Sequence, residues 1–310
     1  TVLLDLFGVG CQYFVEHRLN GAGVGDLLEA LLLDYFVSRG AFAGREGQFV
    51  TSRNIRDRLE RELLPDVALR VQDGSTPDRF VVSGRGELHL SVLIEKMRRE
   101  GYEMGVSRPE VIRRVIDGVE QEPYESLLID CEETHQGPIM EEMGKRRGEL
   151  RDMVPDGKGR VRLEYMIPSR GIIGFRNQFL TMTSGTGVLN SIFDHYGPVK
   201  AGAVAARQNG VLVSMVAGKV LAYALFALQE RGRLFIGPNI EVYEGQLIGI
   251  HSRDNDLAVN PTKGKQLTNV RAAGSDENIL LTPPIRMSLE QALDFIDEDE
   301  LVEVTPQSIR

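Results

Sequence analysis

Residues 83–100 have the sequence SGRGELHLSVLIEKMRRE, and the arrangement of the first part of the chain follows from this stretch. It opens with a polar turn that carries two glycines. Four apolar side chains then recur at i, i+3, i+4 and i+7, so that they share one helical face: Leu90, Leu93, Ile94 and Met97. The last turn collects cations, which the helix dipole favours there: Lys96, Arg98 and Arg99. The pattern predicts a core-packed helix that is entered through a tight turn and stops at Gly101.

The composition is that of a globular protein. The chain has 310 residues, enough for two or three domains, and 42% of them are hydrophobic. No apolar run approaches the length of a membrane-spanning helix, and the opening TVLLDLFGVG lacks the basic start of a signal peptide. Cys11 and Cys131 form no C-x-x-C pair and have no histidine at metal spacing. We therefore expect free thiols, a cytoplasmic location and no membrane partner.

The formal net charge is −9, which by itself argues against a nucleic-acid-binding protein. The charge is segregated along the chain, however. Residues 290–303 contain seven acids and no base, whereas residues 145–176 contain nine lysines or arginines. A basic face can therefore coexist with an acidic total.

The helix of residues 83–100 falls within a β-α-β-β-α-β pattern. Strands are expected at 31–38, 67–71, 80–82, 102–106 and 111–116. The last two are expected to pair with each other around Pro109. The other helix begins after Thr51 or Ser52, either of which can cap it. It places three apolar residues on one face: Ile55, Leu59 and Leu63. This order is that of the ferredoxin-like split unit.

Residues 117–196 repeat the pattern. Strands are expected at 127–131, 160–167 and 193–196, and helices at 135–148 and 172–185. Two similar sandwiches in tandem favour docked modules over a single catalytic cleft.

Residues 197–287 change to β-rich sequence. Strands are expected at 211–216, 220–228, 241–242, 247–251 and 279–281. A polar loop at 252–278 interrupts them, and a loop of this length indicates function or disorder. Ser288 and Gln291 then predict a capping box on a short acidic helix, followed by a strand in 301–310. The predicted fold class is α+β: two tandem ferredoxin-like αβ sandwich modules and a β-rich C-terminal domain with a short helix.

The sequence offers no catalytic or metal site. The glycines of GAGVG, at residues 21–25, lack the G-x-x-x-x-G-K-[ST] spacing of a phosphate loop. His89 lies in an apolar helix without a carboxylate or nucleophile at a recognisable spacing, which indicates a structural role. The other histidines considered are equally isolated: His135, His195 and His251. Ser169 and Ser184 lack a G-x-S-x-G context.

The positive signals are for RNA. Phosphate contact needs long basic side chains on a rigid scaffold and no particular base order. Eight candidates lie in the second repeat: Lys145, Arg146, Arg147, Lys158, Arg160, Arg162, Arg170 and Arg176. Three more lie in the long loop: Lys263, Lys265 and Arg271. The alternative for each one is a solvated surface residue.

Several strings carry a family resemblance. SGRGELHL resembles a hallmark of ribosome-binding GTPases related to elongation factor G. Further strings resemble the TypA/BipA family: FAGREGQFVTSR, EPYE, HQGPIM, PDGKGRVRLEYMIPSRGIIGFRNQFLTMTSGTG, NPTKGKQLTNVRAAG and PPIRMSLEQALDFIDEDELVEVTP. The resemblance covers residues 43–310, and the block after Tyr196 resembles TypA/BipA but not elongation factor G.

The resemblance implies a domain division. Residues 1–30 resemble the end of a GTPase domain. Residues 31–116 and 117–196 resemble domains III and V of elongation factor G, and residues 197–310 resemble the TypA/BipA-specific C-terminal domain. The β-barrel that precedes residue 31 in the family is missing, so the sequence is expected to be a fragment or to join separated pieces.

The resemblance also implies a function. A monomer would dock on 50S or 70S ribosomes, contacting rRNA and tRNA, in ribosome assembly or in translation under stress. The long loop would reach a tRNA acceptor end near the peptidyl-transferase region, although Gln266 stands where the family has a second lysine. No Walker lysine motif, switch sequence or N-K-x-D is present. GTP and Mg²⁺ are therefore expected only in a missing N-terminal domain, and GTP hydrolysis only in a longer parent protein.

Two other function classes remain open at this point. The acidic helix of residues 288–303 could bind a basic partner, which would make the chain a protein-interaction or regulatory module. A free-standing enzyme is the third alternative, although no nucleophile, base or metal cluster is evident in the sequence.

Overall fold

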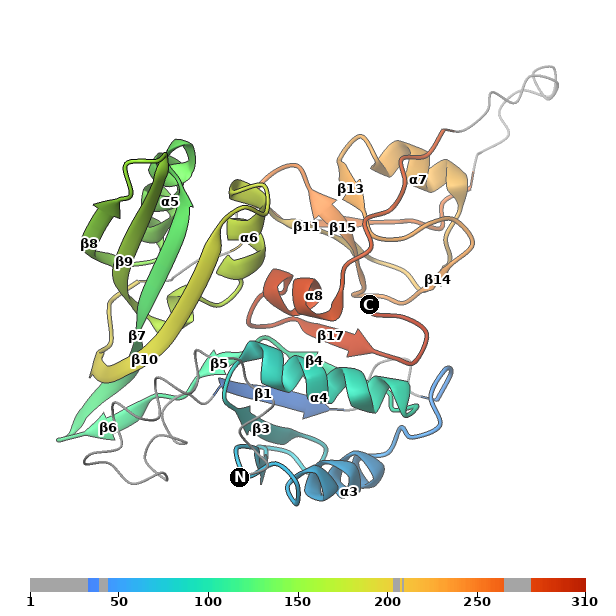
Figure 1. Cartoon of the computed structure of the whole chain (residues 1–310). Coiled ribbons are helices and arrows are strands. Elements are labelled where there is room, and N and C mark those ends of the chain that lie inside the picture. Colours follow the sequence, from blue (N-terminus) through green and yellow to red (C-terminus); the bar gives the residue numbers. More distant parts are fainter. Residues whose placement is uncertain (1–32, 39–43, 203–206, 208, 265–279) are drawn as a thin grey trace.

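The structure is a computed structural model that describes residues 33–38, 44–202, 207, 209–264 and 280–310. It has three parts (Figure 1). The first module contains α4 (Glu87–Arg99), the second module contains β7 (Val119–Glu132), and the third domain contains β11 (Val211–Ser214). The expected GTPase-like segment, residues 1–30, lies outside the described residues.

Four antiparallel strands form the sheet of the first module. They are β1 (Leu33–Ser38), β2 (Arg70–Asp73), β3 (Phe80–Gly84) and β4 (Met104–Ser107). Their order is β4-β1-β3-β2, as expected when two β-α-β halves interleave. Leu33, Tyr35 and Val37 are buried and alternate with half-buried residues along β1. One face of the sheet therefore lies on the core.

Two helices pack in this core. The first is α3 (Ser52–Glu62), and its cap is Thr51, whose hydroxyl accepts the Asn54 N–H at 3.2 Å. The second, α4, buries the four apolar residues predicted for it: Leu90, Leu93, Ile94 and Met97. A Cβ at Gly84 would lie 2.7 Å from the Leu90 side chain. The glycine entry to α4 is therefore a close-packing requirement. The Thr51 cap and the apolar face of α4 follow the sequence prediction, whereas Leu63 lies just after α3 and is only partly buried.

The last elements of the chain pack on the first module. β17 (Leu301–Val304) pairs with β4, and α8 (Leu289–Phe295) packs against α4. The predicted capping box at Ser288 and Gln291 is present. The apolar stripe of α8 enters the first core: Leu289, Ala292, Leu293 and Ile296. Sequence order groups residues 288–304 with the third domain, but their pairing and burial place them here, where β17 covers an otherwise open sheet edge.

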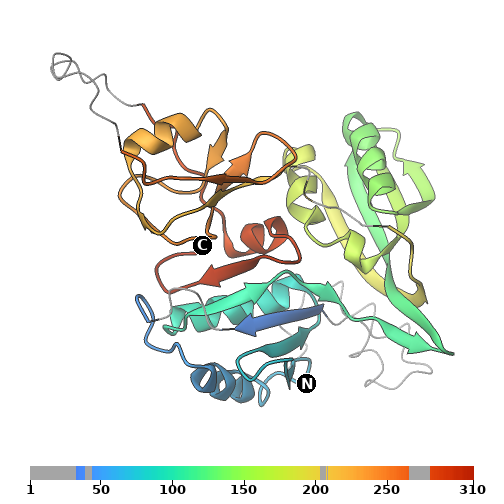
Figure 2. The same ribbon diagram turned by 180° about the vertical axis from the view of Figure 1, so that it is seen from behind.

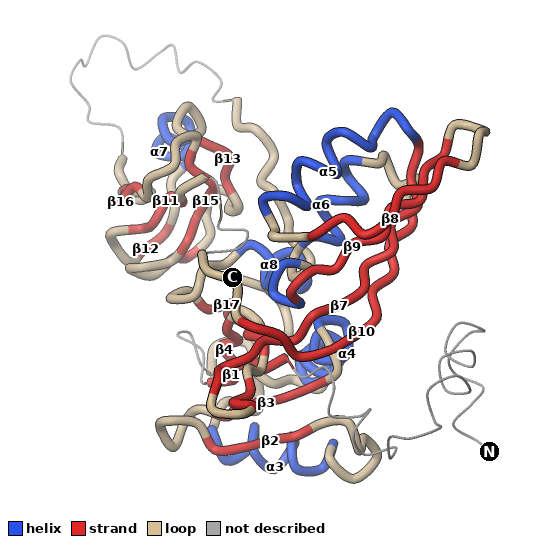
Figure 3. Tube along the Cα trace, turned by 90° about the vertical axis from the view of Figure 1, so that its left-hand side faces the viewer, coloured by secondary structure: helices blue, strands red, loops and turns tan. Residues whose placement is uncertain are grey.

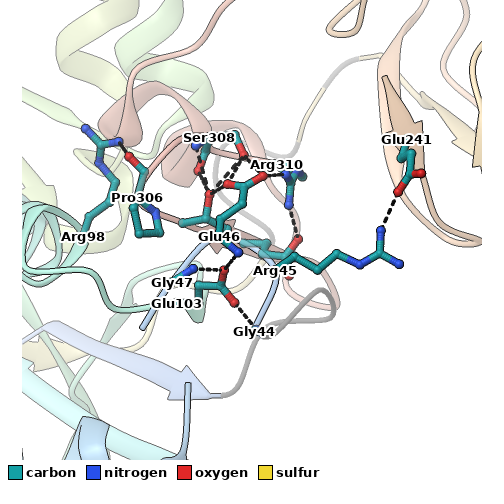
Figure 4. A network of polar contacts seen from close by, with 12 residues as sticks. Gly44, Arg45, Glu46, Gly47, Arg98, Glu103, Glu241, Pro306, Ser308 and Arg310 are labelled. Carbon is teal, nitrogen blue, oxygen red and sulfur yellow. Dashed lines mark hydrogen bonds and ion pairs between the residues drawn. The ribbon is translucent and has the colours of Figure 1, made fainter. Parts of the chain in front are cut away.

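The C-terminal tail is fastened beside this edge (Figure 4). The Glu46 carboxylate accepts hydrogen bonds from the hydroxyls of Thr305 and Ser308 and pairs with Arg310. Burial acts to raise the pKa of Glu46, but these hydrogen bonds and the Arg310 charge lower it overall. The charged carboxylate is thus the form that holds the tail.

The segment that carries Glu46 is itself hydrogen-bonded to Glu103 of the first module. The buried Glu103 carboxylate accepts three backbone N–H groups from it (Figure 4): Gly44, Glu46 and Gly47. Arg45 of the same segment reaches Glu241 of the third domain, at 2.5 Å. Residues 44–47 therefore connect the first module, the tail and the third domain.

The expected pairing of residues 102–106 with 111–116 is wrong. β5 (Glu110–Val111) pairs with β1, and β6 (Arg114–Ile116) pairs with β7 of the second module. The turn between β6 and β7 is Asp117-Gly118, and both residues have positive φ, 52° and 78°. This is the turn that a two-residue hairpin favours, so the local hairpin forms in place of the longer-range pair. The strand expected at 67–71 begins only at Arg70.

The second module repeats the layout. Its elements are β7, α5 (Gln136–Lys145), β8 (Glu149–Pro155), β9 (Arg160–Pro168), α6 (Phe175–Met182) and β10 (Val188–Pro198), with short 3-10 turns η1 (Glu133–His135) and η2 (Ser169–Gly171). The strand order is β10-β7-β9-β8, and this module is ferredoxin-like. The helices lie on one side of the sheet (Figure 3). The sequence does not predict β8, because all seven of its residues are exposed and it lacks an apolar pattern.

The third domain has two small sheets. One joins β13 (Gly232–Leu234), β15 (Leu247–His251), β11 and β16 (Leu257–Val259) in that order. The other pairs β12 (Gly218–Lys219) with β14 (Glu241–Val242). The strand expected at 220–228 is wrong: residues 222–228 form α7 (Ala222–Leu228). Ala224, Leu225 and Leu228 face the core at helical spacing, which a short apolar run does not reveal.

Among the described residues, no helix is long and apolar enough to cross a membrane. Nor do the described ranges hold a cluster of three His, Cys, Asp or Glu side chains that could bind a metal ion. Cys131 is a buried free thiol, and burial raises its pKa, so its reactive thiolate is disfavoured. The strand expected at 279–281 is not formed at 280–281, and Ile279 lies outside the described residues.

Candidate nucleic-acid interface

Two cations at the end of α5 are exposed. Lys145 lies 2.8 Å from the exposed Glu141 carboxylate, a pair that solvent screens and that leaves the ammonium accessible. Arg147 follows the helix with a positive φ of 64°, and its carbonyl accepts the Lys200 ammonium at 3.0 Å. Both side chains can reach a phosphate from this end of the second module.

Arg146, between them, serves the fold. Its Nε donates to Glu142 at 2.9 Å, and its Nη2 donates to Gln178 at the same distance. Its Nη1 donates to the carbonyls of Gly171 and Ile173 at 2.9 and 3.0 Å. The side chain is buried. The expectation that Arg146 contacts RNA is therefore corrected: it fixes the end of α5 to the start of α6.

Arg170 is likewise corrected. Its Nε donates to the fully buried Glu122 at 2.6 Å. Its other nitrogens donate to the carbonyls of Lys200 and Gly202 at 2.5 and 2.9 Å. An arginine in this position neutralises a buried carboxylate, which would be costly to leave unpaired, and it is not available to RNA.

The outer face of the β9 sheet carries two further candidates. Arg160 and Arg162 both point away from α5 and α6, since the alternate residues of β9 fill the core. Asp130 on β7 lies 2.8 Å from Arg160 and 3.5 Å from Arg162. The Arg162 side chain stays 60% exposed. Lys158 is exposed on the turn that precedes them. Arg162 and Lys158 are thus accessible cations, and Arg160 is partly neutralised.

The remaining candidates are dispersed. Arg176 is exposed on α6, and no described residue forms an ion pair with it. Lys263 is exposed in the third domain. Lys265 and Arg271 lie outside the described residues, so their predicted role is carried by the sequence alone.

The basic stretch that is continuous in sequence does not form one patch. Strand β8 runs from Glu149, paired with Met166, to Pro155, paired with Val161. Lys145 and Arg147 therefore lie at one end of the module, and Lys158 and Arg162 lie toward the other. Arg151, on the exposed β8, adds a cation that the sequence prediction did not single out; its side chain is 57% exposed. Arg151 is exposed because β8 is an edge strand, all of whose residues face solvent.

Comparison with protein families assigns two of the three parts. A model of the elongation factor G C-terminus matches residues 119–206, and a model of the TypA/BipA C-terminal domain matches residues 209–310. The chain is 66% identical to a protein of Haemophilus influenzae named large ribosomal subunit assembly factor BipA, and 64% and 53% identical to proteins of that name from Escherichia coli K12 and Buchnera aphidicola. Each alignment covers 89% of this chain. This chain belongs to the TypA/BipA family. It spans less than half of these relatives, 45% to 46% of their lengths.

The acidic segment of this TypA/BipA-family chain is largely occupied by internal contacts. Arg207 lies 2.8 Å from Glu300 and 3.4 Å from Asp297. Asp294 accepts a hydrogen bond from Asn177 at 2.7 Å. Several acids of the segment therefore already have partners within this chain. This speaks against the alternative of a free acidic surface for another protein.

A polar cavity of about 400 Å³ lies where the second module, α8 and Arg207 meet. Four cations line it: Arg108, Lys145, Arg146 and Arg207. Three acids line it as well: Glu142, Asp294 and Asp297. Most of the guanidinium donors already have protein partners, so in this TypA/BipA-family chain the cavity is a polar junction between parts.

His89 has a carboxylate partner that sequence spacing did not reveal. Its Nε2 lies 2.5 Å from Asp66, and its Nδ1 accepts the Arg85 N–H at 3.2 Å. Burial acts to raise the pKa of Asp66, but the bond from His89 and the Ala68 N–H lower it overall. The arrangement ties the loop that holds Asp66 to the first turn of α4.

Proposed function

We propose that this chain is the ribosome-docking part of a large ribosomal subunit assembly factor. The observation that carries the proposal is the 64–66% identity over 89% of the chain with relatives that bear this name. The partners would be the 50S subunit or the 70S ribosome, through rRNA and tRNA. The chain would act as a monomer in the cytoplasm, in subunit assembly and under stress.

The proposed rRNA contacts are the exposed cations. In the second module they are Lys145, Arg147, Lys158, Arg162 and Arg176, together with the half-buried Arg160. Lys263 would contribute from the third domain, and Lys265 and Arg271 are proposed from their sequence alone. Ribosomal RNA presents shape and phosphates, and long cations on a rigid αβ scaffold can bind both.

Two supporting features concern the scaffold. The β4-β1-β3-β2 order of the first module supports a second ferredoxin-like unit. The chain matches less than half of its relatives, and GTP binding, with Mg²⁺, is proposed to belong to a part of the longer protein that this chain does not include. A fold of this kind would then act as a docking arm and leave hydrolysis elsewhere.

The experiment is co-sedimentation of the chain with purified 50S and 70S particles at about 50 and 200 mM salt. Six to ten phosphate contacts would lower the affinity by roughly 10³- to 10⁵-fold across this range. Binding that falls with salt supports the proposal. Absence of binding at both salt concentrations contradicts it for this chain, and the same assay on the longer protein with a non-hydrolysable GTP analogue then shows whether the GTPase part is required.

A further inference from the structure

Helix α7 presents an aromatic face to solvent. Tyr223 and Phe226 are each 43% exposed, and their spacing of three residues places them on the same side of the helix. The opposite side of α7 faces the core of the third domain. Leu221 and Ile240 are also exposed and extend the apolar surface at the start of the helix. We call these four residues the α7 face. Contiguous exposed apolar surface, bordered by polar residues, marks interaction sites on soluble proteins.

Cations without acidic partners border this face. Lys219 and Lys263 are exposed, and no described residue forms an ion pair with either. The segments that carry them are joined nearby, because the Leu221 N–H, two residues after Lys219, donates to the Pro261 carbonyl, two residues before Lys263, at 3.1 Å. Glu241, opposite Lys219 in the β12–β14 ladder, is paired with Arg45. The charge at this end of α7 is therefore positive.

The other end of α7 carries one charge of each sign. Arg231 and Glu230 are both exposed there, so the rim is positive at the start of the helix and neutral at its end. In Figures 1 and 2, α7 lies at the outer end of the third domain, away from the first and second modules. A large partner can therefore approach α7 without meeting the first or the second module.

The chain on both sides of residues 265–279 is anchored at α7. Gly264 lies next to the Leu221 side chain. At the other end of the helix, the Gln229 amide donates to the Leu280 carbonyl at 3.1 Å and accepts the Thr282 N–H at 3.0 Å. The third domain thus builds a fixed frame around the α7 face, which is the arrangement that a preformed binding surface requires.

We propose that the α7 face is a stacking platform for unpaired nucleobases of RNA, with Lys219 and Lys263 holding the adjacent phosphates. The inference rests on the proposed function, which supplies RNA as the partner. A protein partner would be expected to place acids on these lysines or apolar side chains on the rings. Unpaired cations at the start of a helix that carries exposed aromatic rings fit a nucleotide strand better. Duplex RNA hides its base faces, so looped or single-stranded RNA is the substrate class.

The test uses the full chain and a single-stranded RNA of about 12 nucleotides, a length in the range of single-strand sites, with 2-aminopurine at its centre. Stacking on the rings is expected to change the fluorescence of the probe. Tyr223→Ala and Phe226→Ala should each weaken binding about 5- to 150-fold, as expected for loss of one stacked base. The salt dependence should not change, because no phosphate contact is lost.

The controls separate the two kinds of contact. Lys219→Ala and Lys263→Ala should each reduce the salt slope by about 0.7. Tyr223→Phe should keep the wild-type affinity, and Val115→Ala, at an exposed apolar site in another module, should have no effect. Tyr223→Leu and Phe226→Leu keep an apolar side chain and remove the ring; if alanine variants are unstable, loss of the fluorescence change in these variants still tests the stacking.

Three outcomes overturn the inference. One is wild-type affinity in the ring-deleting variants, another is equal affinity for a duplex of the same sequence, and the third is absence of oligonucleotide binding by a chain that sediments with 50S particles. In the third case the proposed function stands and only the platform fails. A chain that binds neither RNA nor particles contradicts both.

Discussion

The Arg170 guanidinium lies 2.6 Å from the Glu122 carboxylate, and Glu122 has no exposed surface. The same carboxylate accepts the Lys200 N–H at 2.8 Å. The pair therefore joins the 3-10 turn η2, strand β7 and the chain that follows β10. Arg170 lies in a basic stretch of the sequence, yet its contacts stabilise the second module. We therefore expect its substitution to lower the free energy of unfolding whether or not it changes RNA binding.

We predict that Arg170→Ala destabilises the chain by about 3–5 kcal/mol, because it leaves a buried carboxylate unpaired. Arg176→Ala, an exposed neighbour on α6, is the matched control and should change the free energy of unfolding by less than about 0.5 kcal/mol. Urea unfolding followed by circular dichroism measures both. Equal stability of the two variants would contradict an interior role for Arg170.

A second prediction concerns pH and Glu87, at the start of α4. Burial, with the neighbouring Asp294 carboxylate, raises the pKa of Glu87 to about 7. The charge of Glu125 also raises this pKa. The hydrogen bond from the Gly174 N–H, at 3.3 Å, and the charge of Arg108 lower it in part. The pKa of Glu87 in the folded state thus lies above the ordinary glutamate value of 4.5, so the folded state binds more protons between these two pH values. Stability therefore falls as pH rises from about 4.5 to 7, and the loss is complete above 7.

Glu87→Gln removes the charge and keeps the shape. We expect it to stabilise the chain at pH 8 by on the order of 3 kcal/mol, since one pKa unit corresponds to about 1.4 kcal/mol. At pH 4 the gain should disappear, because the native Glu87 is then protonated in both states. The exposed Glu298, changed to glutamine, is the control. Chemical unfolding at pH 4 and pH 8 measures the gain. An equal gain in the free energy of unfolding at both pH values would contradict the explanation.

The third prediction concerns Arg207, which joins the third domain to the acidic segment. Its side chain is 11% exposed and lies 2.8 Å from Glu300 and 3.6 Å from Asp256. Arg207→Ala should destabilise the chain by about 3–5 kcal/mol by leaving carboxylates unpaired. The double variant with Glu300→Gln should cost less than the sum of the single changes, with a coupling of about 0.5–3 kcal/mol. Thermal and urea unfolding of the four proteins complete the cycle, and strict additivity would show that the pair is not coupled.

The parts of the fold that follow from the sequence are those with a strong local pattern. The α4 stripe, the Thr51 cap and the Ser288 capping box all appear where predicted, because caps and amphipathic faces are local. The exposed strand β8 had no apolar alternation to reveal it, and the run at 222–228 was compatible with strand or helix. The placement of α8 and β17 on the first module depends on an edge strand some 200 positions earlier, which no local pattern encodes.

The site was less predictable than the fold. The sequence shows which residues are cations but not which groups surround them. Arg146 and Arg162 look alike in sequence, yet one is buried against carbonyl groups and the other is 60% exposed. The difference lies in which residues of the second module pack around each guanidinium. The apolar run at 222–228 predicts a strand, in which Tyr223 and Phe226 would lie on opposite faces; only the helix places them on one side.

The last prediction concerns the exposed cations at one end of the second module. Lys158→Ala and Arg162→Ala should each reduce the salt slope of 50S binding by about one unit, since each would remove one phosphate contact. Arg53→Ala, an exposed arginine on α3 of the first module, is the matched control for loss of one positive charge. Co-sedimentation with 50S particles across a salt series measures the slopes. If Arg53→Ala lowers the slope as much as the other two, binding depends on the overall charge of the chain, and the specific face of β9 has no part in it.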